Sequence, residues 1–229
     1  MVTLFWGSIT ILASFISNTS VIPHKIARLW GQSILLASGI KVAAKGLSNI
    51  HPGKSYIYMP NHMSNFDIPV LLDALPGQFR WLAKAELFKI PLFGYAMQRV
   101  GCISIDRSNR KSAVASLNQA AKIIKQGVSV LIFPEGTRSH NNTIMPFKKG
   151  GFVLAIETKV PIVPVIIHGT GAIMPKKQIR IQPQDVVIEF TAPVPSREYS
   201  KRTRDDLMEK VHHIICKSFE KSYQGRSLC

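Results

Sequence analysis

The chain has 229 residues, of which 46% are hydrophobic, and its formal net charge is +16. This length fits one domain with a good core plus an appendage, and so apolar a composition favours membrane contact. The three cysteines share no metal-ligand spacing and do not make an even set, which argues against a disulfide framework and favours a reducing compartment.

Nearly all of the excess positive charge lies in residues 1–180. Such a charge suits an anionic membrane surface, a phosphorylated substrate or nucleic acid. The basic residues are scattered, the aromatic residues lie in apolar runs, and no nucleic-acid motif or zinc-ligand spacing occurs. We therefore expect no nucleic-acid partner and retain the first two possibilities.

The N-terminal region contains two apolar segments. Residues 2–22 carry no charged side chain, but their strongly apolar part, 4–16, is about 13 residues long, short of the ~20 that cross a bilayer. Pro23 breaks this run, and a second apolar segment follows at 26–44. We predict two short helices that lie in or dip into one leaflet, with Trp6 and Trp30 as interface anchors. A span extended through 17–20 and a soluble helical pair packed on the core are the alternatives.

The first polar motif follows a predicted strand at 55–59, which Pro60 ends. Ser64 and Asp67 have the spacing of a capping box, so His62 is predicted to lie on a tight turn before a helix. A carboxylate beside an imidazole fixes its tautomer, which leaves the other ring nitrogen free to accept a proton. Taken alone, the spacing fits a capping Asp and a structural loop histidine equally well.

From about residue 54 onward, strand-like and helix-like runs alternate, which predicts an α/β sandwich with a largely parallel sheet. The best helix, at 110–126, places its apolar residues on one face and ends at Gly127. The remaining predicted strands lie at 79–83, 101–105, 128–133, 161–167 and 186–191, and the other helices at 151–158 and 203–223.

A second polar motif, Pro134–Ser139, follows the buried strand predicted at 128–133. Loops at the carboxyl ends of strands carry the ligands of open α/β sheets. Gly136 allows close approach of the backbone, and the fork of Arg138 matches phosphate oxygens. Without further context, a glycine turn with a solvated arginine explains the same residues.

Taken together, the motifs resemble those of the glycerolipid acyltransferase family, specifically the 1-acylglycerol-3-phosphate acyltransferases. The resemblance covers roughly residues 45–195, and its specificity comes from the correct order of all the blocks. These blocks are NHMSNFD at 61–67, the segment 84–88 with Pro91 and Gly94, GCISIDR at 101–107, FPEGTRS at 133–139 and VPIVPV at 160–165. The resemblance implies a glycerolipid-acyltransferase-like α/β sandwich at 45–229. The predicted two-helix membrane anchor at 1–44 precedes it.

The resemblance also implies roles for individual residues. His62 is expected to be the general base, and Asp67 to orient and stabilise it. The expected ligands of the substrate phosphate are Lys84, Gly101, Arg107, Glu135, Gly136, Thr137 and Arg138. An apolar segment is expected to line the core or the acyl pocket, with Val160, Pro161, Ile162 and Pro164 as its members.

The implied reaction moves an acyl chain from acyl-CoA or acyl carrier protein to the 2-hydroxyl of 1-acylglycerol 3-phosphate, giving phosphatidate. It needs no metal and no redox cofactor. The expected partners are these substrates, an anionic membrane surface and acyl carrier protein, and the expected location is the cytoplasmic face of a bacterial inner membrane. The alternatives are acyl transfer to another lysolipid, such as a lyso-ornithine lipid or a lysophospholipid, and a membrane-binding protein without turnover.

Overall fold

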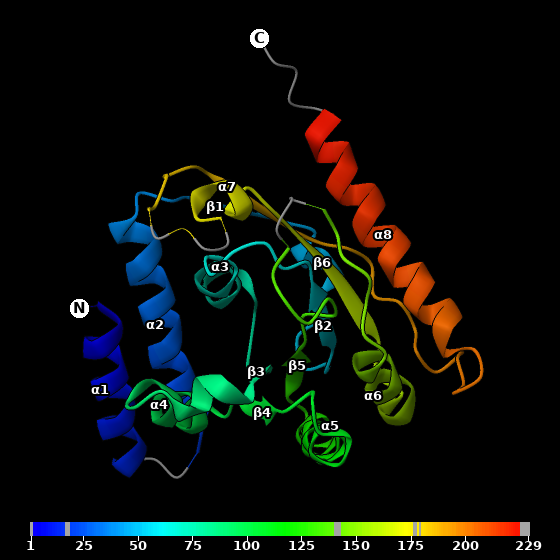
Figure 1. The fold of residues 1–229 in the computed structure, drawn as a ribbon, viewed down its shortest axis with the longest axis horizontal. Helices are drawn as coiled ribbons and strands as arrows, with labels where there is room; N and C mark the ends of the chain where they lie inside the picture. Colours follow the sequence, from blue (N-terminus) through cyan, green and yellow to red (C-terminus); the bar gives the residue numbers. More distant parts are fainter. Residues whose placement is uncertain (1, 17–18, 140–142, 176–177, 179, 225–229) are drawn as a thin grey trace.

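The structure is a computed structural model that describes residues 2–16, 19–139, 143–175, 178 and 180–224. These residues form a seven-stranded sheet with helices on both faces (Figure 1). The strand order is β1-β7-β6-β2-β5-β3-β4, and neighbours run parallel except for the antiparallel pair β6 and β7. The strands are β1 Val42–Lys45, β2 Ile57–Pro60, β3 Phe79–Lys84, β4 Ile103–Ile105, β5 Ser129–Leu131, β6 Ile162–His168 and β7 Val186–Phe190. The predicted α/β class with a largely parallel sheet is confirmed.

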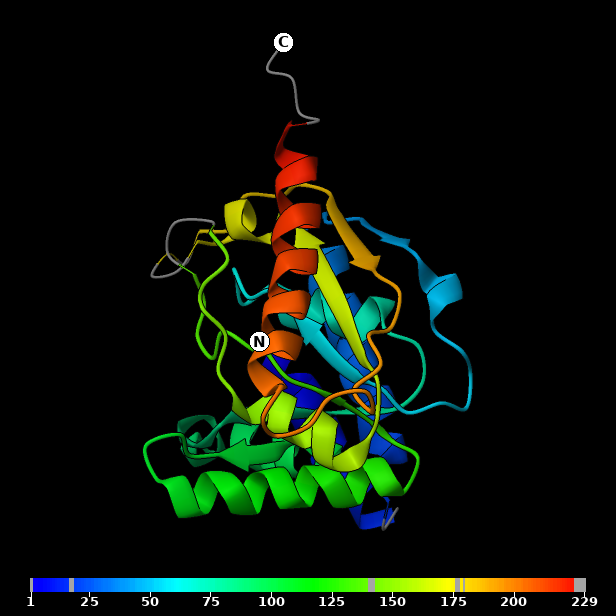
Figure 2. The same cartoon turned by 90° about the vertical axis from the view of Figure 1, so that its right-hand side faces the viewer.

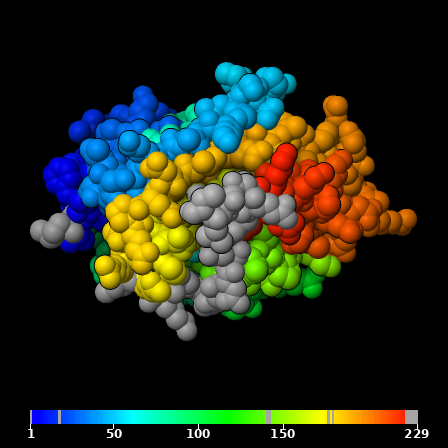
Figure 3. Space-filling model, turned by 90° about the horizontal axis from the view of Figure 1, so that it is seen from above, coloured from blue at the N-terminus to red at the C-terminus, as the bar shows by residue number. Residues whose placement is uncertain are grey.

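Two groups of helices enclose the sheet. Helices α2 (Val21–Ala37) and α3 (Asp67–Ala74) pack on one face, and α5 (Arg110–Lys125), α6 (Gly150–Thr158) and α8 (Arg204–Gln224) cover the other. Figure 2 shows α5 and α8 crossing their face, and Figure 3 shows the N-terminal helices and α8 at opposite ends of the molecule. Because both faces are covered, every residue of β2 and β6 is buried, as the uninterrupted apolar runs of central parallel strands require.

The N-terminal region differs in part from the prediction. Two helices form, α1 (Val2–Ile16) and α2, but Pro23 lies in the first turn of α2, where its missing N–H costs no helical hydrogen bond. The second apolar segment was predicted as one helix over 26–44, yet α2 ends at Ala37. Residues 42–45 form β1, which pairs with β7 at the edge of the sheet. The expected boundary between residues 44 and 45 therefore falls inside a strand.

No helix among the described residues is long and apolar enough to cross a membrane. Helix α1 packs on α2 and on α4 (Phe93–Val100) rather than on the sheet. The short helices α7 (Thr170–Ile173), η1 (Leu47–Asn49) and η2 (Ala85–Lys89) complete the fold. The sequence prediction did not include β1, α4 or α7.

The sheet brings the polar motifs together. Strands β2, β5, β3 and β4 are consecutive neighbours and all run parallel, so their carboxyl ends meet at one edge. His62 follows β2, the segment 133–139 follows β5, and Lys84 ends β3. Arg107 follows β4. Motifs far apart in the sequence thus converge at the edge where open α/β sheets bind ligands.

Candidate active site

The turn between β2 and α3 holds His62 against Asp67. The imidazole Nδ1 lies 2.7 Å from Asp67 Oδ2, and the side chain of Asp67 is fully buried while that of His62 is 16% exposed. The same carboxylate oxygen accepts hydrogen bonds from the backbone N–H groups of Met63, at 2.8 Å, and Ser64, at 2.9 Å. A carboxylate held by two amides cannot follow a moving ring, so it fixes the orientation of His62.

Only half of the predicted capping box forms. The carboxylate of Asp67 accepts from the Ser64 N–H, but the Ser64 hydroxyl does not return the bond. This hydroxyl instead donates to the Met174 carbonyl, at 2.8 Å, and accepts from the Phe66 N–H, at 3.2 Å. Ser64 therefore ties the turn to the segment that follows α7.

The segment after β5 holds the backbone and the ring of His62. Glu135 Oε1 accepts from the His62 N–H at 2.7 Å, and the Ser139 N–H donates to the His62 carbonyl at 2.9 Å. The Phe133 ring stacks on the imidazole, with centroids 3.8 Å apart and planes inclined by 18°. The third sequence block thus positions the histidine of the first block.

Glu135 lies in an unusual environment for a carboxylate. It is 1% exposed, and its second oxygen, Oε2, accepts from the Met145 N–H at 2.9 Å. Burial raises the pKa of Glu135 to about 7, although the hydrogen bonds from the Met145 and His62 N–H groups act in the opposite direction. Glu135 is not among the described residues that line the cavity. Its carboxylate instead contacts backbone amides, and its expected role as a phosphate ligand stays a prediction.

Basic side chains gather beside His62. Among the described residues that line the same cavity as His62, three carry a positive charge: Lys84, Arg107 and Arg138. Gly136 and Thr137 line it as well. The Arg107 guanidinium donates to the Gly136 carbonyl, and the exposed Lys84 pairs with Glu86 at 2.9 Å. The structure thus brings five of the seven expected phosphate ligands together, while their roles stay predictions.

The backbone conformation at Gly136 favours a glycine. Its φ is +78°, in the left-handed region that side chains disfavour. A Cβ atom at this position would also lie 2.7 Å from Arg107 Nη1. The group that lies close to the Gly136 backbone is therefore the Arg107 guanidinium.

Gly101, another expected phosphate ligand, serves the fold. It ends α4 with φ at +86°, and a Cβ there would lie 2.6 Å from Arg80 Nε. Gly101 is not among the described residues that line the cavity. The structure shows it as a left-handed helix cap against the buried Arg80, and its expected role at the phosphate stays a prediction.

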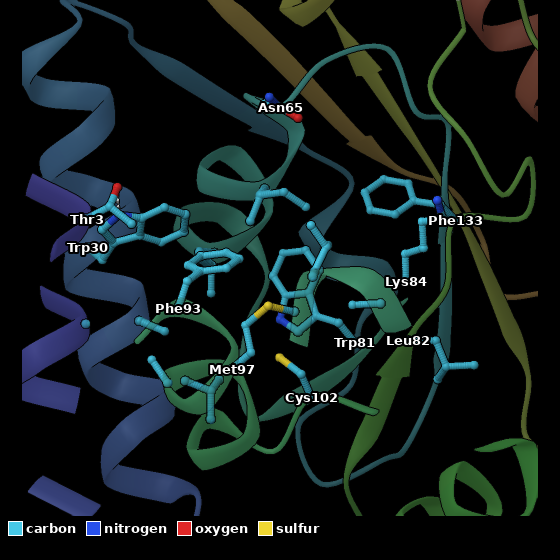
Figure 4. Close-up of a pocket in the computed structure, with 18 of the residues that line it drawn as sticks. Thr3, Trp30, Asn65, Trp81, Leu82, Lys84, Phe93, Met97, Cys102 and Phe133 are labelled. Carbon is cyan, nitrogen blue, oxygen red and sulfur yellow. Dashed lines mark hydrogen bonds between the residues drawn. The ribbon is translucent and has the colours of Figure 1, made fainter. Parts of the chain in front are cut away.

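The cavity has a volume of about 450 Å³ and is largely apolar. Its walls come from α1, α2, α4 and β3, and Figure 4 shows Trp81, Phe93, Met97 and Cys102 gathered in its interior. Phe133 and Lys84 lie on the side away from Thr3 and Trp30 (Figure 4). Because His62 stacks on Phe133, the site joins an apolar chamber bounded by the N-terminal helices.

The four residues predicted to line the acyl pocket lie in or beside a buried strand. Ile162 and Pro164 belong to the central strand β6, Val160 packs against the core, and Pro161 immediately precedes the strand. None of Val160, Pro161, Ile162 and Pro164 is among the described residues that line the cavity. Their apolar character reflects a buried strand, and their place in an acyl pocket stays a prediction. The apolar wall of the cavity includes α4, where Phe93, Ala96, Met97 and Val100 recur at helical spacing.

Comparisons with known proteins add independent findings. A family model described as Acyltransferase matches residues 41–168. The human 1-acyl-sn-glycerol-3-phosphate acyltransferase alpha is 32% identical over 97% of this chain and 80% of its own length. A chloroplastic 1-acyl-sn-glycerol-3-phosphate acyltransferase from Brassica napus is 40% identical over 66% of this chain and 44% of its own length. The crystal structure of the 1-acyl-sn-glycerophosphate acyltransferase PlsC from Thermotoga maritima superposes with a TM-score of 0.81 and 28% identity. That match covers 99% of this chain and 92% of the other.

Proposed function

The chain belongs to the acyltransferase family of the 1-acyl-sn-glycerol-3-phosphate acyltransferases, and from this premise we propose that His62 is the general base in acylation of 1-acylglycerol 3-phosphate to phosphatidate. The observation that carries this proposal is the His62–Asp67 pair, 2.7 Å apart, in a cavity that also contains three cationic side chains. An imidazole whose Nδ1 donates to a carboxylate presents a basic Nε2.

The proposed reaction proceeds in two steps. His62 Nε2 takes the proton of the 2-hydroxyl as that oxygen attacks the carbonyl carbon of the acyl thioester. The tetrahedral intermediate then collapses, the carbon–sulfur bond breaks, and the leaving thiolate recovers the proton from His62. Asp67 stabilises the imidazolium that exists between the two steps. His62 acts as the base and the Asp67 carboxylate orients it, and this chemistry needs no metal or redox cofactor.

The basic side chains suit the phosphate of the acceptor. Arg107 and Arg138 offer forked donors, and Lys84 offers a compact charge. We assign the acceptor phosphate to this group, together with the backbone around Gly136. Glu135 is excluded from the assignment because its carboxylate is buried and already accepts two hydrogen bonds.

The apolar part of the cavity suits an acyl chain. Its walls are aromatic and aliphatic side chains of α1, α2, α4 and β3. Placing a chain there would remove its methylene groups from water, at about 0.8 kcal/mol for each one buried. The reacting carbonyl or hydroxyl would then lie at the His62 side of the chamber.

A membrane surface is the proposed location. Large apolar side chains on the outer faces of α1 and α2 are exposed: Leu4, Phe5, Leu12, Phe15, Ile16, Val21, Ile22, Leu29 and Leu36. Because α1 also lines the cavity, binding of this surface to a leaflet would place the chamber next to the lipids that carry the substrates. The net charge of +16 would reinforce the contact with anionic headgroups.

The decisive experiment measures turnover of the full-length protein with vesicles. Lysophosphatidate, a lyso-ornithine lipid and a lysophospholipid with a head group are offered as acceptors, each with acyl-CoA and with acyl carrier protein as donor. We expect lysophosphatidate to give the highest kcat/KM. Preference for another lysolipid would reassign the acceptor, and absence of turnover with every pair would contradict the proposed function.

A further inference from the structure

The segment 133–139 contains two sets of residues that face different targets. Gly136, Thr137 and Arg138 line the cavity, where a ligand would contact them. Glu135 and Ser139 are buried and bond the backbone of His62, one at its N–H and the other at its carbonyl. The segment therefore joins a binding surface to a support for the proposed base.

We propose that Glu135 is a positioning residue for the reaction, whose carboxylate fixes the backbone of His62 and leaves the acceptor phosphate to other side chains. This inference rests on the proposed role of His62 as general base. It goes further by giving Glu135 a role that acts through His62 and by dividing the segment into supporting and binding residues.

The hydrogen bonds of Glu135 favour the carboxylate form, which the side chain adopts above its raised pKa of about 7. Its two oxygens accept from two different backbone amides, those of His62 at 2.7 Å and Met145 at 2.9 Å. A carboxylate is acceptor-only at both oxygens, whereas a glutamine amide would direct its NH₂ group at one of these two N–H donors. An aspartate is shorter by one methylene and would not reach both amides from the same backbone position.

The surroundings of Glu135 exclude direct contact with a phosphate group. Its side chain is 1% exposed, so a ligand in the cavity does not reach it. The nearby carboxylate of Asp67 already opposes the negative form of Glu135. A phosphate dianion brought to the same place would add repulsion. Yet loss of this anchor would release the His62 backbone, and misplacement of a reacting group by about 1 Å is worth roughly 100-fold in rate.

The test compares Glu135→Gln with Arg138→Ala in the full-length protein. The control variant is Glu157→Gln, which removes an exposed carboxylate on α6 that pairs with Lys201, away from the cavity. For Glu135→Gln we expect kcat to fall roughly 100-fold while the KM for lysophosphatidate stays within about 2-fold of the wild-type value. Arg138→Ala should instead raise the acceptor KM, and Glu157→Gln should change neither parameter.

A second readout does not depend on turnover. The titration of the His62 imidazole, followed by NMR of protein labelled with ¹⁵N-histidine, should shift in Glu135→Gln and stay unchanged in Glu157→Gln. A raised acceptor KM in Glu135→Gln would assign this residue to ligand binding and overturn the inference. An unchanged His62 titration together with a normal kcat in Glu135→Gln would also overturn the inference, even if the free energy of unfolding fell. If the wild-type protein does not acylate lysophosphatidate, the proposed function fails, and the NMR titration alone decides the inference.

Discussion

Replacement of Asp67 by asparagine gives the sharpest test of the proposed base. Asp67 Oδ2 accepts from His62 Nδ1, Met63 N–H and Ser64 N–H, whereas Oδ1 is buried and has no hydrogen-bond partner among the described residues. If the asparagine oxygen takes the place of Oδ2, the NH₂ group is buried at the Oδ1 position. If the amide is reversed, its NH₂ group faces the two backbone N–H donors and stabilises the wrong tautomer of His62. Both arrangements leave a polar group unsatisfied.

The magnitude follows from the geometry. A unit positive charge on His62 and a unit negative charge on Asp67, 2.7 Å apart, interact by about 6 kcal/mol at an effective dielectric constant of about 20. Asparagine removes this stabilisation of the imidazolium, so kcat/KM should fall by up to ~10⁴-fold. The unsatisfied amide should also lower the free energy of unfolding by about 1–3 kcal/mol.

The assay is acyl transfer to lysophosphatidate on vesicles, with folding checked by circular dichroism and thermal unfolding. Asp73→Asn is the matched control, because Asp73 lies on the same helix and accepts a hydrogen bond from the exposed Gln32. It should keep wild-type turnover. Retention of more than about a tenth of the wild-type kcat/KM by folded Asp67→Asn would refute charge stabilisation of His62 by Asp67.

Three further predictions concern the phosphate ligand, the N-terminal surface and pH. Arg138→Ala should remove about 1.5–3 kcal/mol of transition-state stabilisation, measured as a lower kcat/KM for the acceptor. A rise in the thioester KM alone would contradict the assignment of Arg138 to the acceptor phosphate. Leu12, Phe15 and Ile16 are exposed on α1. Their replacement by serine should weaken co-sedimentation with vesicles and leave turnover of a short-chain soluble acceptor intact. Unchanged vesicle binding would place the membrane contact elsewhere. Burial raises the pKa of Glu135 from 4.5 to about 7, so between these values the folded state keeps a proton that the unfolded state has lost. Glu135 should therefore reduce the free energy of unfolding by about 3 kcal/mol as pH rises from about 4.5 to 7. Denaturant titrations should show the wild type losing free energy of unfolding relative to Glu135→Gln as pH rises over this range, and a constant difference would contradict the shift.

The vesicle experiment targets single side chains because deletion of residues 1–44 would damage the fold. Leu35 and Ile40 belong to the buried core, and Arg28 donates to the carbonyls of Asp73 and Leu75. Deleting 1–44 would also remove most of β1 from the sheet. The exposed side chains of α1 carry none of these contacts.

Local features of the fold and site were predictable from the sequence. His62 and Asp67 are five residues apart across a helix start, so short-range geometry brings them together. Strands β2, β5 and β6 stand out as apolar runs, and the cationic residues of the cavity lie at or after the ends of strands. The order of the strands makes these loops neighbours.

Long-range features were not predictable from local pattern. β1 lies in an apolar segment that continues the helical composition of α2, and only its distant partner β7 makes it a strand. Hydrophobicity alone does not separate a cavity wall from a core, so the sequence did not distinguish the buried strand around Ile162 from the helix α4 that lines the cavity. The hydrogen bonds of Glu135 were not predictable because its partners are backbone amides, which no sequence motif specifies.

The pairing of β1 with β7 has a consequence for biosynthesis. Val42 pairs with Val186, so β1 has no partner until Val186 has also left the ribosome. At 5–20 residues per second this interval lasts on the order of ten seconds. Helices α1 and α2, which carry exposed apolar side chains, leave the ribosome before β7 does. During this interval the edge of β1 is unpaired. A nascent chain in this state has time to meet a lipid surface or a chaperone before the sheet closes, and a chain that stops before Val186 would keep an open edge.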